Sequence, residues 1–246
     1  MHMTESSAAP PEGTAVPIDP HTTPDFATAA LITIDVQRDT LDGGPLEIPG
    51  TSAAASAMRT LLDAFRSSGR PIVHVVRLYR PDGSNVDPCR RGAVEGGLRV
   101  LAPGQDGSQP AVGLLPDAWL TLDAELLLAG SIQQLAPREV VIYKPRWGAF
   151  YDTPLYAHLR EQDVTTLVFC GCNFPNCPRT SIYEASERDY RIVLATDATS
   201  GVYERGEQEL AAIGVQLMTA GEATDAVAAT GGGPSSASPQ REGTAQ

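Results

Sequence analysis

Cys177 has the residue type and the position of a catalytic nucleophile. It follows a strand-end glycine, Gly171, by six residues and precedes Pro178, where a helix is expected to begin. A helix N-terminus presents positive partial charge and free N–H groups, which lower the pKa of a thiol and can stabilise an oxyanion. The alternative is a buried structural cysteine, because most free cysteines pack in cores and are inert.

Asp35 and Lys144 each end a strongly apolar segment. Asp35 closes ALITID (30–35) and Lys144 closes EVVIYK (139–144). A charge at the end of a buried strand is costly unless it is paired or kept for acid–base chemistry. The alternatives are a helix N-cap or a surface acid for Asp35, and a solvated lysine at the rim of a sheet for Lys144.

Strands and helices alternate along the chain. Apolar runs predict strands at 30–35, 72–79, 139–144, 164–171, 191–198 and 215–218, and helices are expected at 51–68, 153–161, 175–189 and 203–213. The alternation predicts an α/β fold, a three-layer doubly wound sandwich with a mostly parallel sheet of about six strands and helices on both faces. Active sites of such folds lie at the carboxyl ends of the strands. Asp35, Lys144 and the segment 170–177 are therefore expected to converge.

Composition sets the expected domain boundaries. Residues 1–25 and 229–246 are rich in small and polar residues, so we expect two disordered tails around one domain at 26–228. Within the domain, residues 80–136 have little periodicity beyond a weak helix near 117–129. Long irregular segments of this kind are often functional loops.

Charge and cysteine content exclude several classes of protein. The net charge of −12 argues against nucleic-acid binding, because phosphate contacts dominate that affinity. The chain has no apolar run of membrane-spanning length, and residues 1–26 lack an apolar run behind a basic segment, so neither a membrane nor export is expected. Four cysteines are too few for a disulfide scaffold in a chain of 246 residues, which favours reduced thiols in the cytoplasm.

Three ordered motifs resemble the isochorismatase-like cysteine hydrolases over roughly residues 29–220. LITIDVQRDT resembles the family's strand-one motif, in which an apolar strand precedes Asp-x-Gln-x-Asp-Phe; Asp35, Gln37 and Asp39 match, and Thr40 replaces the usual Phe. YKPRWGAFYDTPL resembles the family's lysine motif, and GCNFPNCPRTSIYEASERDYRIVLATDA resembles its nucleophile loop, helix and next strand. The matching positions there are Lys144, Ala149, Phe150, Thr153, Leu155, Gly171, Cys177, Thr180, Ala185 and Asp197.

The resemblance implies a catalytic triad of Asp35, Lys144 and Cys177. It further implies a cis peptide bond between Cys172 and Asn173, and an oxyanion hole formed by the amides of Asn173 and Cys177. The implied reaction is hydrolysis of an amide-type C–N bond of a small molecule through a thioester, without a cofactor. Carboxamide and ureido or carbamoyl substrates both stay open, and the family commonly forms homo-oligomers.

Substrate contacts are a further set of expectations. Arg77 and Arg80 close the second strand and could meet a substrate carboxylate, or be a solvated pair. Trp147 and Phe150 could wall a planar substrate or belong to the core. Two more candidates, Gln37 and Phe174, lie in the motifs, the latter where Phe-Pro-Asn-Cys-Pro replaces the usual Thr-Asn-x-Cys-Val.

Two other classes of function compete with a hydrolase. Cys170, Cys172 and Cys177 form a C-x-C-x4-C pattern, which could bind zinc or cycle between oxidation states, although no fourth ligand is nearby. A non-catalytic binding protein on the same fold is the other alternative. The nicotinamidases of the family bind zinc through an Asp-x-His pair and a distant His. Because the four histidines here do not stand in that arrangement, no metal is predicted, and His74 is expected in the core or the pocket.

Overall fold

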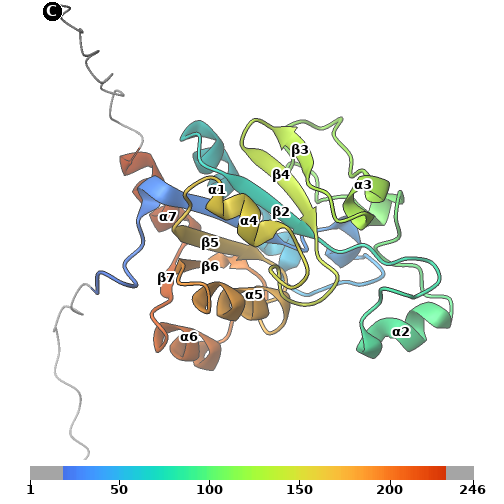
Figure 1. The fold of residues 1–246 in the computed structure, drawn as a ribbon. Helices are drawn as coiled ribbons and strands as arrows, with labels where there is room; N and C mark the ends of the chain where they lie inside the picture. The colour runs from blue at the N-terminus through green and yellow to red at the C-terminus, as the bar shows by residue number, and fades with distance from the viewer. Residues whose placement is uncertain (1–18, 231–246) are drawn as a thin grey trace, which may run out of the picture.

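The computed structural model describes residues 19–230, which form one seven-stranded sheet between two layers of helices (Figure 1). The strand order is β3-β4-β2-β1-β5-β6-β7, with β3 antiparallel to β4 and every other pair parallel. The strands are β1 (Ala29–Ile34), β2 (Ile72–Val76), β3 (Gln133–Ala136), β4 (Glu139–Tyr143), β5 (Thr166–Gly171), β6 (Arg191–Thr199) and β7 (Gln216–Met218).

Alternate side chains of the central strands feed two separate cores. Even-numbered residues of β1, such as Ile32, pack with α4, α5 and α6, whereas odd-numbered residues, such as Leu31, pack with α1 and α7. Because both faces are covered, β1 is apolar and buried along its whole length. The helices are α1 (Thr51–Ser67), α2 (Pro88–Glu95), α3 (Ala124–Leu128), α4 (Leu155–Arg160), α5 (Cys177–Ser186), α6 (Glu204–Ala211) and α7 (Ala220–Ala229), with short 3-10 turns at Phe26–Thr28, Arg38–Thr40 and Asp106–Ser108.

The chain direction across the sheet reverses at β1. From β1 it proceeds to β2 and β4 on one side, and later elements, β5 to β7, are added on the other. A crevice forms outside the carboxyl ends of the strands at such a switch point, since the connections leave in opposite directions. Asp35 follows β1 at this point, and the segment after β5 lies beside it.

The predicted α/β sandwich is confirmed, with differences in four of its elements. β3, α2 and α7 were not expected, and β2 ends at Val76 rather than at residue 79. The expected tails lie mostly outside the described residues. Within the N-terminal one, the Asp25 amide donates to Thr166 Oγ1 (2.9 Å) and the carbonyl of Pro20 accepts from Arg191, so contacts with the domain begin before residue 26.

Gly171 allows β5 to approach β1 more closely than any other residue could. Its φ is +126°, and a Cβ atom there would lie 2.2 Å from the carbonyl oxygen of Ile34. We expect Gly171→Ala to lower the free energy of unfolding by about 3 kcal/mol or more, because backbone strain and a steric clash combine. Gly221→Ala in α7 is the matched control, since its nearest neighbour would be 3.9 Å away. Equal urea midpoints for the two variants would contradict this account.

Candidate active site

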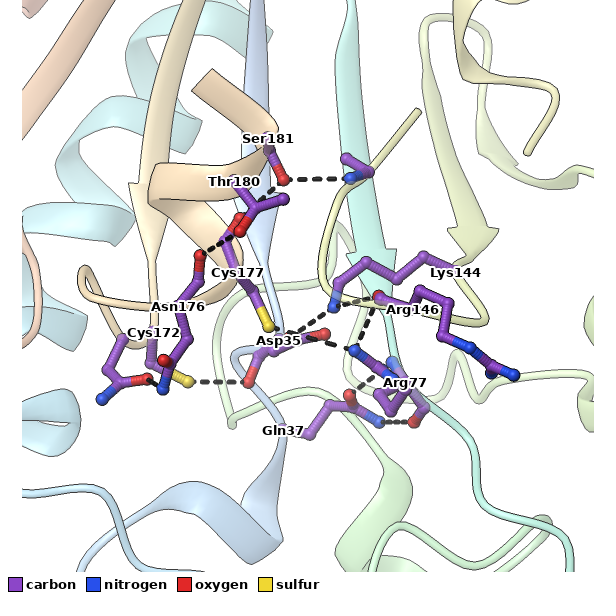
Figure 2. A network of polar contacts seen from close by, with 12 residues as sticks. Asp35, Gln37, Arg77, Lys144, Arg146, Cys172, Asn176, Cys177, Thr180 and Ser181 are labelled. Atoms are coloured by element: carbon purple, nitrogen blue, oxygen red, sulfur yellow. Dashed lines mark hydrogen bonds and ion pairs between the residues drawn. The ribbon is translucent and has the colours of Figure 1, made fainter. Parts of the chain in front are cut away.

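The three residues of the expected triad meet at the carboxyl edge of the sheet (Figure 2). Asp35 follows β1, Lys144 follows β4 and Cys177 is the first residue of α5. Lys144 Nζ lies 2.8 Å from Asp35 Oδ2, and the lysine side chain is fully buried. The Cys177 sulfur points toward the Asp35 carboxylate from the opposite side. The structure therefore brings together an acid, a cation and a thiol from three separate segments.

Backbone contacts of Asp35 direct its carboxylate into the site. Its N–H continues the sheet by donating to the Val75 carbonyl (2.9 Å), and its φ of +52° then turns the chain out of the strand. Its own carbonyl accepts from the Gln37 amide and from the Cys172 thiol. Among the described residues, Asp35 Oδ1 is buried and has no hydrogen-bond partner. An unpaired carboxylate oxygen beside a thiol is placed to accept a proton.

Lys144 is held by the strand that it follows. Its backbone N–H donates to the Val76 carbonyl (3.0 Å), which extends the parallel register by one residue beyond β4. Its ammonium donates to the Arg146 carbonyl (3.2 Å) as well as to Asp35. A buried cation with two fixed acceptors is oriented rather than solvated, and this excludes the alternative of a lysine at the rim of the sheet.

The expectation of a lowered thiol pKa is wrong for Cys177 in this structure. The pKa of Cys177 is raised to about 11, chiefly by burial and next by the nearby Asp35 carboxylate, while Lys144 and Arg77 act in the opposite direction. The helix start and the lysine therefore do not outweigh desolvation. The resting thiol is protonated at neutral pH, so nucleophilic attack requires that a base take the proton.

This raised pKa makes a prediction for thiol labelling. We expect iodoacetamide at pH 7 to modify Cys89, which is exposed, well before Cys177, which is buried. Because only the thiolate reacts, labelling of Cys177 should rise roughly tenfold for each pH unit between 7 and 9. Peptide mapping by mass spectrometry measures both sites in one sample. Rapid, pH-independent labelling of Cys177 would contradict the assigned protonation state.

Two residues that the sequence did not single out connect α5 to the loop after Lys144. Ser181 Oγ donates to the Cys177 carbonyl (2.7 Å) and accepts the N–H of Ala149 (3.0 Å). Glu184 accepts the N–H of Phe150 (2.8 Å). Both are polar residues on the inner side of a helix, and this position is the only feature of the sequence that could have indicated their role. They connect the helix that begins at Cys177 to the loop after Lys144.

The segment between β5 and α5 presents two backbone donors to the site. The peptide bond between Cys172 and Asn173 is cis, as the resemblance implied. Among the described residues, no acceptor takes the N–H of Asn173 or of Cys177. The latter is one of the free amides at the start of α5. Unused amides beside a nucleophile are suited to bind an oxyanion.

Two residues that were expected to contact a substrate are instead bonded to other groups of the protein. Gln37 is buried: its amide group donates to the carbonyls of Arg77 (2.8 Å) and Ser108 (2.6 Å) and accepts the Arg77 N–H. The Arg77 guanidinium pairs with Asp87 (2.7 Å) and donates to the Arg146 carbonyl (2.6 Å). Gln37 therefore positions loops, and Arg77 lies behind the triad with its charge compensated. Asp87, in the irregular segment 80–136, was missed.

The other residues expected to contact a substrate are not among those that line the cavity at the thiol. Arg80 is exposed. Phe150 belongs to the core and lies against Tyr190, with ring centroids 6.0 Å apart. Phe174 is fully buried, and Trp147 packs on the same core while the guanidinium of Arg90 stacks on its ring. Most of the aromatic residues in and beside the motifs are therefore core residues. The sequence of a motif does not tell a core aromatic residue from one that lines a pocket.

A small cavity of about 20 Å³ adjoins the thiol. Asp35, Arg77 and Cys177 line it, together with the cis peptide between Cys172 and Asn173. Such a volume is close to that of one water molecule, so a substrate must displace a wall to enter. The remaining lining residues are Thr40, Leu46, Ile48, Arg90 and Leu101.

The alternative of a cysteine-based metal or redox module lacks geometric support. Cys170 packs in the core beneath α1, whereas Cys177 packs on the opposite face of the sheet. In the range 19–230, no group of three or more His, Cys, Asp or Glu side chains could hold a metal ion. Both nitrogens of His74 are engaged, with Thr33 (2.9 Å) and Glu139 (2.8 Å), so it is a core residue. No helix in that range combines the length and apolarity needed to cross a membrane.

Comparisons with known proteins identify the family of the chain. The family model of the isochorismatase domain matches residues 29–225, and the chain belongs to this family. A ureidoacrylate amidohydrolase (RutB) of Methylorubrum extorquens is 36% identical over 71% of each chain. A protein of Arabidopsis thaliana named as a probable inactive nicotinamidase is 28% identical over 71% of this chain and 82% of its own. The crystal structure of an isochorismatase family protein from Desulfovibrio vulgaris has 30% identity and a TM-score of 0.69, covering 82% of this chain and 98% of the other.

Proposed function

We propose that this protein hydrolyses an amide-type C–N bond of a small molecule, with Cys177 as nucleophile. The observation that carries the proposal is the buried Asp35–Lys144 pair facing the thiol, with one carboxylate oxygen free. The amidohydrolase activity in the name of the Methylorubrum relative supports the same class of reaction. It also keeps ureido substrates beside carboxamides as candidates.

Proton transfer between Asp35 and Cys177 starts the reaction. Asp35 takes the thiol proton, and the sulfur attacks the carbonyl carbon to form a tetrahedral adduct. Lys144 stabilises the negative charge of the Asp35 carboxylate and, after proton transfer, that of the thiolate. The amides of Asn173 and Cys177 bind the oxyanion. Asp35 then returns the proton to the leaving nitrogen, so the C–N bond breaks and a thioester and an amine or ammonia result. Water attacks the thioester, Asp35 takes its proton, and the acid and the free thiol are released.

The test is a panel of small amides, lactams and ureides assayed for release of ammonia or amine. We expect turnover of at least one class, and intact-mass measurement during turnover should detect the acyl adduct on the protein. If no product were released from any of these compounds, that result would instead support the alternative of a non-catalytic binding protein. The label "inactive" in the name of the Arabidopsis relative shows why that outcome belongs in the test.

A further inference from the structure

Arg90 lines the cavity beside the thiol, and no residue in the described part of the chain compensates its charge. It lies in the first turn of α2 and lines the cavity together with Asp35 and Cys177. Its guanidinium donates to the hydroxyl of Tyr79 (2.9 Å) and stacks on the Trp147 ring, 5.5 Å from its centroid. None of the ion pairs among the described residues includes Arg90.

The Tyr79 hydroxyl does not neutralise Arg90. Burial raises the pKa of Tyr79 to about 12, so the hydroxyl is uncharged at neutral pH. It donates to Asp87 (3.0 Å), and the same carboxylate oxygen pairs with Arg77. Asp87 therefore compensates Arg77, and Asp35 compensates Lys144. One positive charge, that of Arg90, is left over beside the protonated thiol.

An excess cation at a half-buried cavity wall favours an anionic ligand. A guanidinium has five N–H donors, and this one uses a single donor within the described chain. Its planar fork matches a carboxylate better than a point charge would. Three further walls, Leu46, Ile48 and Leu101, are apolar, whereas Thr40 and the cis peptide add polar groups to the lining. Together these features suit a short hydrocarbon linker between a carboxylate and the scissile carbonyl.

We infer that Arg90 selects substrates in which a carboxylate lies a few bonds from the amide-type carbonyl, such as monoamides of short dicarboxylic acids and ureido acids. The inference rests on the proposed function, whose nucleophile and acid–base residue share the cavity. It also moves the expected carboxylate contact away from Arg77 and Arg80, of which the first is compensated and the second exposed. Trp147 acts as a positioning residue that holds the guanidinium plane.

The experiment compares matched substrates and matched variants. The substrates are malonamate, succinamate, glutaramate and N-carbamoylglycine, each paired with a neutral analogue in which a methyl ketone replaces the carboxylate. We expect Arg90→Gln to lower kcat/KM for the preferred acid about 10- to 100-fold, mainly through KM, and to leave its neutral analogue within about threefold. Arg90→Lys should restore part of the loss. Arg91→Gln removes the same charge from the next residue of α2, outside the cavity lining, and should match wild type.

Calorimetric titration of the same acids into Cys177→Ala separates this inference from the proposed function. Binding of an acid that is lost in Cys177→Ala/Arg90→Gln supports the role of Arg90 even if no compound is hydrolysed. Equal kcat/KM for acids and neutral analogues would overturn the role of Arg90 while leaving the hydrolase intact. The proposed role of Arg90 would also be overturned if none of the acids were bound or hydrolysed.

Discussion

Replacement of Cys177 by alanine is expected to lower the rate of C–N bond hydrolysis by about 10⁴-fold or more. The thiol is the group that would carry the acyl intermediate, and removal of the nucleophile from a catalytic triad lowers kcat by a factor of this order. Asp35 and Lys144 would stay paired in this variant, because their contact does not involve the sulfur. Release of ammonia or amine from a substrate found in the panel measures the effect.

The control for this variant is Cys89→Ser. Cys89 is exposed on α2 and is not among the residues that line the cavity, so its activity should equal that of the wild type. Circular dichroism of both variants checks the fold. A Cys177→Ala protein that keeps a tenth of the activity would exclude covalent catalysis at this position and return Cys177 to the class of buried structural cysteines.

Lys144→Met is expected to abolish activity and to lower the free energy of unfolding by about 3–5 kcal/mol. The variant leaves the Asp35 carboxylate nine-tenths buried without its cation, and breaking one side of a buried ion pair costs this much. Asp35→Asn leaves the Lys144 ammonium in the same situation. The double variant Asp35→Asn/Lys144→Met removes both charges and should be more stable than the sum of the single losses predicts. Urea unfolding of the four proteins gives the coupling energy.

An exposed ion pair of nearly equal length serves as the control. Arg205 and Glu209 lie 2.9 Å apart on α6, with the arginine side chain 84% exposed, and Arg205→Met should change stability far less. Additive losses for Asp35 and Lys144 would show that the two charges do not depend on one another. Full activity of Lys144→Met would remove the lysine from the proposed mechanism.

The convergence of the three segments that carry Asp35, Lys144 and Cys177 could be predicted because it depends on local patterns. Asp35 and Lys144 end apolar runs, and the carboxyl ends of parallel strands lie at one edge of the sheet. Cys177 follows a glycine that the close contact with Ile34 requires. Each of these signals lies within a few residues in the sequence, so the order of strands and helices was sufficient to bring the three segments together.

The substrate contacts could not be predicted, because they depend on pairings between distant side chains. Whether Arg77 meets a substrate is decided by Asp87, which lies in a segment without periodicity. Short elements were missed for a related reason: α2 contains a glycine and few apolar residues, so it has no clear buried face. α7 did bear a signal, since Thr219 and Glu222 form a capping box, but its small Ala and Gly side chains give little contrast between faces.

The segment from Tyr79 to Leu101, which holds Arg90, packs around a small core of its own. Tyr79, Val86, Val94, Val100 and Leu101 contact one another there, apart from the two cores that flank the sheet. Exchange of this segment between relatives should therefore alter which molecules are accepted while the strand ends that hold Asp35, Lys144 and Cys177 keep their geometry. In evolution and in protein engineering alike, the reaction can stay the same while substitutions in this one segment change the substrate.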